Sequence, residues 1–206
     1  MGRREEKKRI TQSRILEMSG PLFVKRGYAQ CTIDDIVKAV GIARGTFYLY
    51  FEDKASVFQA LLTDLYHPIV VILTNALEDM AANHTNPMAH QIRYIRTAVE
   101  LAQFIETKQS ALPLHFREVW AAGSQGHAIR HWKQQIEDLA AQLIASSIQH
   151  GLIRKVPPNL TAMAVVGATE RIIWGWLHGE LPQSRRELAQ ELAALFWQGI
   201  APNQAG

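Results

Sequence analysis

One segment constrains the fold more than any other: Cys31–Lys54, which reads CTIDDIVKAVGIARGTFYLYFEDK. Thr32 is a favourable N-cap residue, and the two acidic residues after it suit the positive end of a helix dipole. Gly41 predicts the end of this helix, because glycine adopts the left-handed conformation without strain. Residues 44–50 predict a second, very short helix. Two short helices joined by a glycine-containing turn form a helix-turn-helix.

The second helix of such a motif enters the major groove of DNA, so its outward side chains are candidate contacts. Arg44 is expected to pair with guanine or a phosphate, and Gly45 lets the backbone approach DNA closely. Leu49 is expected either to touch a thymine methyl group or to pack on Phe47 or Tyr50. Nearby hydroxyl groups and the ends of the flanking helices can add phosphate contacts. The candidate DNA-binding residues are Thr32, Ile33, Arg44, Gly45, Thr46, Tyr48, Leu49, Tyr50 and Lys54.

Charge is unevenly distributed along the chain. The first 54 residues hold eleven Lys and Arg residues and seven Asp and Glu residues, whereas the remainder holds eleven and twelve. The formal net charge of the whole chain is only +3. A basic N-terminal quarter on a near-neutral body indicates a polyanion as its partner, and with the motif above this is double-stranded DNA.

Composition places the chain among ordinary globular proteins and predicts a cytoplasmic location. Hydrophobic residues make up 48% of the 206 residues and charged residues 20%. The first ten residues are charged, unlike a secretory signal. The longest aliphatic run, 69–73, is far shorter than the ~18–20 residues that span a bilayer, so no membrane partner is expected. Cys31 is the only cysteine, which excludes an intramolecular disulfide, and its place before a helix cap indicates a structural role.

Helical periodicity continues through the rest of the chain, and no strand-like alternation persists. The patterns are separated by loop signals and cover residues 54–83, 88–106, 113–122, 125–150, 160–178 and 185–199. We therefore expect an all-α protein of about nine helices. A three-helix helix-turn-helix domain over 1–53 precedes a larger helical domain over 54–206. The helix that starts at Lys54 connects the two, and Pro68 within it is a candidate hinge.

The two C-terminal helices predict a homodimer. Residues 160–177 are apolar on nearly every face, which is typical of a helix buried on all sides. The last helix begins with a capping box, Ser184 and Glu187, and carries a leucine-rich stripe. Two such helices from each subunit can form a four-helix interface, although they can also close the core of a monomer. The candidate interface residues are Val166, Glu170, Ile173, Trp174, Leu188, Leu192, Leu195 and Phe196.

The run TIDDIVKAVGIARGTFYLYFEDK resembles the DNA-binding domain of TetR-type (tetracycline-repressor-like) transcriptional regulators, and the resemblance covers about residues 10–65. It implies an all-helical homodimer in which a ligand-binding and dimerisation domain follows the DNA-binding domain. Members of this family are usually repressors that a small molecule releases from DNA. The chain departs from the family at Ala43, where Ser or Thr commonly caps the recognition helix. It also departs at Gly20-Pro21, which predicts a bend in the first helix near residues 17–21.

A repressor of this kind needs an effector pocket in its body. Aromatic and polar side chains cluster in 94–120 and 170–178, and apolar walls with a few polar groups suit a small organic ligand. The expected effector is largely apolar, and either neutral or anionic. The candidate pocket residues are Tyr94, Phe104, His115, Phe116, Glu118, Trp120, Trp174 and His178.

The histidines of the chain point to two other classes of function. All eight histidines follow residue 54. His127 and His131 are four residues apart, and His115 and Glu118 are three apart, which are spacings that a divalent metal can use. A helical metal-binding enzyme or a protein-interaction module is therefore the alternative. The chain has neither a Gly-rich phosphate loop nor a Gly-x-Ser-x-Gly elbow, so no enzyme, cofactor or metal site is expected.

Overall fold

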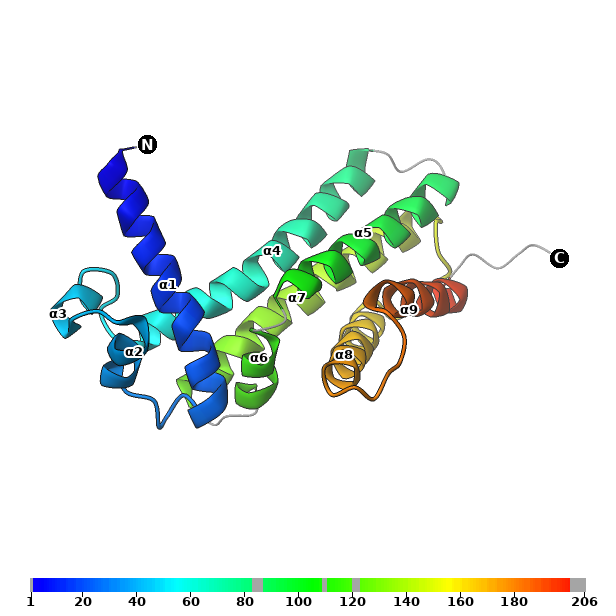
Figure 1. Cartoon of the computed structure of the whole chain (residues 1–206). Coiled ribbons are helices and arrows are strands. Elements are labelled where there is room, and N and C mark those ends of the chain that lie inside the picture. Colours follow the sequence, from blue (N-terminus) through cyan, green and yellow to red (C-terminus); the bar gives the residue numbers. More distant parts are fainter. Residues whose placement is uncertain (1, 83–86, 109–110, 120–122, 201–206) are drawn as a thin grey trace. The chain divides into compact units, whose positions relative to one another are not determined.

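The computed structural model describes residues 2–82, 87–108, 111–119 and 123–200. These residues form nine helices and no strand, which confirms the all-α prediction. In chain order the helices are α1 (Arg3–Arg26), α2 (Ile33–Val40), α3 (Arg44–Phe47), α4 (Lys54–Ala82), α5 (Pro87–Thr107), α6 (Leu112–Glu118), α7 (Ser124–Gln149), α8 (Pro158–Leu177) and α9 (Arg185–Ile200) (Figure 1).

The ends of α2 follow from local chemistry, as predicted. The Asp35 N–H donates to Thr32 Oγ1 at 3.2 Å, and the Thr32 N–H donates to Asp35 Oδ2 at 3.0 Å, so the two residues form a capping box. Gly41 ends the helix in the left-handed conformation, with φ 74° and ψ 41°. Its N–H donates to Val37 O at 2.9 Å, which satisfies one of the last free carbonyl groups.

The recognition helix α3 is shorter than predicted. It covers Arg44–Phe47, and residues 48–50 form a turn instead of continuing the helix to residue 50. Ala43 provides no side-chain cap, as its methyl group predicts. The segment is also rich in residues of low helix propensity, which do not favour a longer helix. These residues are Gly45, Thr46, Phe47, Tyr48 and Tyr50.

Both prolines inside long helices are accommodated without ending them. Helix α1 continues through Pro21 to Arg26, and α4 continues through Pro68 to Ala82. Gly27 ends α1 with a positive φ of 84°. The bend near residues 17–21 stays a prediction.

The chain forms two compact units. The first contains residues 1–67 and 108–131, and the second contains residues 68–107 and 132–206. Helices α4 and α7 therefore contribute to both units, and the division in α4 falls at His67 and Pro68. These compact units differ from the predicted division at residue 53, because the first half of α4 shares its core with α1–α3. The functional division into 1–53 and 54–206 stays a prediction.

Aromatic residues form the core of the first unit. The rings of Phe23, Tyr28 and Phe58 contact one another with centroids 5.0–6.1 Å apart. Phe47, from the recognition helix, is fully buried, as its inward position predicts. Burying a phenylalanine contributes about 1.5–3 kcal/mol, so Phe47 holds α3 firmly to the rest of the unit.

Helix α4 also bears on the expectation of no membrane partner. Among the described residues, α4 is the one helix that is both long enough and apolar enough to cross a membrane, judged by length and composition alone. Counting uninterrupted aliphatic residues missed this property, because polar residues interrupt the run. Phe58 and Leu62 are buried in the first unit, and Leu73 and Met80 in the second. A core helix of this kind passes the same test, so the property is weak evidence for a membrane span.

Candidate DNA-binding surface and ligand cavity

The recognition helix and the turn after it expose most of the predicted DNA contacts. Arg44, Gly45, Tyr48 and Leu49 are exposed, whereas Thr46 and Tyr50 are half-buried. Leu49 is 73% exposed, so the expected packing on Phe47 or Tyr50 is wrong. An apolar side chain held this far into solvent is available to a thymine methyl group.

Arg44 is oriented before any DNA binds. Its Nη1 donates to Asp34 Oδ1 at 2.7 Å, and its Nη2 lies 3.4 Å from the Tyr48 hydroxyl. The hydrogen bond with Tyr48 and the charge of Asp34 raise the pKa of Arg44. Because a guanidinium group has five N–H donors in one plane, these contacts leave donors for a base or a phosphate.

The start of α2 is less open to phosphate than predicted. Thr32 is exposed and Ile33 is half-buried, but both polar groups of the Thr32 cap already bond to Asp35. Hydrogen bonds from Thr32 and Arg26 hold the pKa of Asp35 below its usual value. A phosphate contact from Thr32 or Ile33 stays a prediction.

Lys54 is bonded within the first unit, and its predicted phosphate contact stays a prediction. Its Nζ donates to Tyr28 O at 2.7 Å and to Cys31 O at 2.7 Å, and lies 3.4 Å from Ala29 O. The same ammonium group lies 4.3 Å from the centroid of the Tyr28 ring. Because its donors are occupied by the turn between α1 and α2, Lys54 is a structural anchor for the helix-turn-helix.

Helix α6 packs against α1 within the first unit. Arg117 Nη1 donates to Val24 O at 2.6 Å, and Glu118 Oε1 accepts from the Tyr28 N–H at 3.3 Å. His115 is buried and forms a hydrogen bond with the Tyr66 hydroxyl. Three predicted pocket residues, His115, Phe116 and Glu118, therefore lie in the unit that contains the recognition helix.

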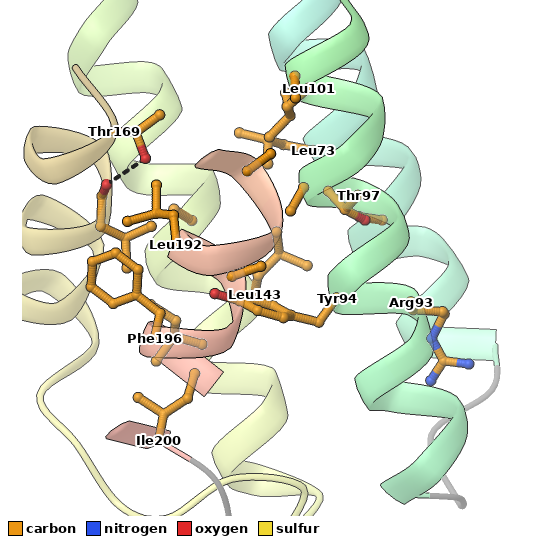
Figure 2. A pocket seen from close by; sticks show the side chains of 18 of the residues that line it. Leu73, Arg93, Tyr94, Thr97, Leu101, Leu143, Thr169, Leu192, Phe196 and Ile200 are labelled. Carbon is orange, nitrogen blue, oxygen red and sulfur yellow. Dashed lines mark hydrogen bonds between the residues drawn. The ribbon is translucent and has the colours of Figure 1, made fainter. Parts of the chain in front are cut away.

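The second unit contains a cavity of about 250 Å³. Residues of α4, α5, α7, α8 and α9 line it, and most of them are aliphatic. Figure 2 shows Leu143, Leu192 and Phe196 among the side chains around it. A mostly apolar cavity with few polar groups is the usual form of a small-molecule site.

Of the seven predicted pocket residues that the structure describes, Tyr94 is the one that lines this cavity. Phe104, Trp174 and His178 belong to the second unit but are not among the lining residues. Trp174 and His178 stack on each other with ring centroids 3.8 Å apart, and both are exposed. The prediction for Trp120 lies outside the described residues.

Sequence reasoning missed several polar lining residues: His90, Arg93, Thr97 and Thr169. One signal was available, because His90 and Thr97 are spaced four residues before and three residues after Tyr94. Residues at these spacings share one helical face. No comparable signal distinguished Thr169, which lies on a helix with little amphipathic contrast.

The predicted dimer residues are divided between two faces. Four of them line the cavity of their own chain: Ile173, Leu188, Leu192 and Phe196. These four side chains therefore face the interior of the second unit, and a dimer interface on α8 and α9 stays a prediction. Lys133 donates to Glu170 from α7, and Val166 is half-buried. Leu195 is 65% exposed on the outer side of α9.

The residues considered for a metal do not converge in the described part of the chain. His127 and His131 are exposed on α7, and His115 is occupied by Tyr66. Among the described residues no three His, Cys, Asp or Glu side chains gather as metal ligands.

One unit carries an exposed, oriented arginine on the second helix of a helix-turn-helix, and the other contains an apolar cavity. These are the features of an all-helical DNA-binding regulator. Residues 15–61 match the family model of bacterial regulatory proteins of the tetR family. This match and the similar proteins support a TetR-type transcriptional regulator, as the sequence predicted.

Three similar proteins illustrate the relationship. The chain is 24% identical to the uncharacterised HTH-type regulator YhgD of Bacillus subtilis, with 92% of this chain and 96% of YhgD covered. It is 25% identical to the HTH-type transcriptional repressor BepR of Brucella suis, with 82% of each covered. The structure of the SmeT–triclosan complex has a TM-score of 0.72 at 17% identity, covering 94% of this chain and 93% of SmeT. SmeT is the repressor of a Stenotrophomonas maltophilia multidrug efflux pump, and at this identity the likeness shows the fold.

Proposed function

We propose that the protein is a homodimeric repressor that binds a near-palindromic operator and is released by a small, largely apolar molecule. The observation that carries the proposal is Arg44, which is exposed on the recognition helix and oriented by Asp34 and Tyr48. In a dimer, two such helices would read half-sites about one helical turn, or a multiple of it, apart. The repressor BepR and the complex of SmeT with triclosan support this reading by analogy.

The metal-enzyme and protein-interaction alternatives are not favoured. The relatives are transcriptional regulators, and the histidines that could serve a metal point to no common site in the described residues. A cytoplasmic location remains the expectation for a regulator that acts on DNA.

Selection of bound duplexes from a random DNA pool tests the proposal. We expect enrichment of a near-palindromic sequence, and binding that weakens steeply as salt rises. The selection is repeated after unfolding and refolding, which removes any ligand that co-purifies with the protein. Failure to enrich a sequence at low salt in both preparations would contradict the proposal.

Gly45→Ala tests whether the recognition helix lies against DNA. A Cβ at Gly45 meets no atom within 4 Å, and the φ of Gly45 is not positive. The variant should therefore be as stable as the parent chain, or about 0.5–1 kcal/mol more stable. Against DNA the added methyl group should collide with the groove, and we expect operator affinity to fall at least about fivefold.

Thermal unfolding and fluorescence anisotropy with the selected duplex measure these two effects. Gly199→Ala is the matched control, because its Cβ also meets open space and it lies in the other compact unit. Unchanged operator affinity in Gly45→Ala would mean that this backbone does not approach DNA.

The homodimer predicts the effect of a charge on the outer side of α9. Leu160, Met163 and Leu195 are 64%, 57% and 65% exposed on α8 and α9, so these helices have apolar side chains that a second subunit could cover. Leu195→Glu should place a carboxylate in the interface and lower the dimer association constant at least about tenfold. Sedimentation velocity measures the change. Ile92→Glu, at a residue 60% exposed on α5, is the control that should leave the dimer intact. If Ile92→Glu weakened the dimer and Leu195→Glu did not, the dimer interface would lie on α5.

A further inference from the structure

The cavity of the second unit is apolar and has no acidic group among its described lining residues. Its walls are mainly aliphatic, and none of the described residues that line it is an aspartate or a glutamate. A cationic ligand would lose its hydration there without gaining a counter-charge, which is costly in an apolar site. The cavity therefore suits a ligand without a positive charge.

Most of the hydroxyl groups on the wall already have an acceptor. Thr169 Oγ1 donates to Val165 O at 2.8 Å, Ser147 Oγ donates to Leu143 O at 2.7 Å, and Thr161 Oγ1 donates to Pro157 O at 2.9 Å. Each of these bonds runs to the carbonyl four residues earlier in sequence. These hydroxyl protons are therefore not available to a ligand.

Tyr94 differs from them. Figure 2 shows its side chain reaching from α5 toward Leu143, Leu192 and Phe196. Its ring packs on Trp197 with centroids 5.7 Å apart, and the buried His90 ring packs on the same indole, also at 5.7 Å. Among the described residues, none forms a hydrogen bond with the Tyr94 hydroxyl. The hydroxyl is thus held in place, beside the cavity, with an unused donor.

The protonation states around Tyr94 are also defined. Burial raises the pKa of Tyr94 to about 12, so the hydroxyl keeps its proton at neutral pH. Burial and the charge of Arg93 lower the pKa of His90, which favours the neutral imidazole. In Figure 2 the Arg93 side chain lies apart from the Tyr94 ring and from the apolar side chains that the ring approaches. The group offered to a ligand beside Leu143, Leu192 and Phe196 is therefore a neutral donor, Tyr94.

We propose that this cavity binds a neutral, mostly apolar molecule with one hydrogen-bond acceptor, such as a ketone or ester carbonyl, to which the Tyr94 hydroxyl donates. The assignment rests on the proposed function, since the cavity is taken as the effector site. An apolar cavity of about 150 Å³ is known to bind benzene, which has six non-hydrogen atoms, so in proportion a cavity of about 250 Å³ suits a ligand of about ten.

Four probes of similar length test the assignment on the full chain without DNA: 2-nonanone, nonane, octanoate and nonylamine. Binding is followed by titration calorimetry and by tryptophan fluorescence, because Trp176 lines the cavity. We expect 2-nonanone to bind more tightly than octanoate or nonylamine. Tyr94→Phe removes one oxygen atom and should weaken 2-nonanone about 3- to 10-fold while leaving nonane unchanged. Thr107→Val is the control. It removes a hydroxyl from α5 outside the cavity lining, and should leave both affinities unchanged.

Several results would overturn the assignment. These are equal 2-nonanone affinity in Tyr94→Phe, tighter binding of octanoate or nonylamine than of 2-nonanone, or no binding of 2-nonanone up to its solubility limit. A loss in Thr97→Val instead of Tyr94→Phe would also overturn it, since Thr97 stands one turn further along α5. The proposed regulatory function is tested separately. Sequence-specific DNA binding without 2-nonanone binding would contradict the ligand assignment alone. Binding of 2-nonanone without sequence-specific DNA binding would contradict the proposed function as a regulator.

Discussion

Arg44→Ala is expected to weaken binding to the selected operator about 10- to 100-fold, while binding to random DNA falls far less. The reason is geometric. An arginine that contacts both O6 and N7 of a guanine loses both hydrogen bonds when it is truncated. Asp34 and Tyr48 hold the guanidinium group of Arg44 in the free protein, so less conformational entropy is lost when it meets a base.

Fluorescence anisotropy with the selected duplex and a scrambled duplex of equal length measures this difference at fixed salt. Arg171→Ala is the control, because it removes an equally exposed arginine, paired with Glu180, from the other compact unit. It should change both affinities little. An equal loss on the two duplexes in Arg44→Ala would assign this arginine to a phosphate, and no loss on either would remove it from the interface.

Lys54→Met is expected to lower the free energy of unfolding of the DNA-binding region by about 1.5–3 kcal/mol. Methionine keeps most of the aliphatic stem but removes the ammonium group. The carbonyl groups of Tyr28 and Cys31 would then lose a charged donor at 2.7 Å, in a part-buried site where water replaces it poorly. The contact with the Tyr28 ring would be lost as well.

Urea denaturation followed by circular dichroism measures the change. Lys38→Met is the matched control, because Lys38 is exposed near the end of α2 and should alter stability by less than about 0.5 kcal/mol. Because Lys54 is occupied by backbone carbonyls, the salt dependence of DNA binding should stay the same in Lys54→Met. An unchanged stability together with a salt slope reduced by about one would restore the phosphate contact predicted from sequence.

The candidate DNA-binding surface could be predicted from sequence because it depends on neighbours in the chain. The alternation of buried and outward residues around Phe47 placed Arg44 and Gly45 outside. The ligand cavity could not be predicted in the same way. Tyr94 was identified by its residue type, but Thr169 and Leu192 line the same cavity from α8 and α9, and no periodicity within one helix shows which other helices share its cavity.

Local sequence alone determined both ends of α2 and the start of α9. The caps at Thr32 and Ser184 and the left-handed turn at Gly41 form bonds within a few residues, so they do not depend on the rest of the fold. Only the tertiary structure decided three further points: that Lys54 binds the turn before α2, that α6 joins the unit of the recognition helix, and that the stripe of α9 faces the cavity of its own chain. Each of these depends on which distant segment covers a side chain, and that choice is made by the packing of the whole core.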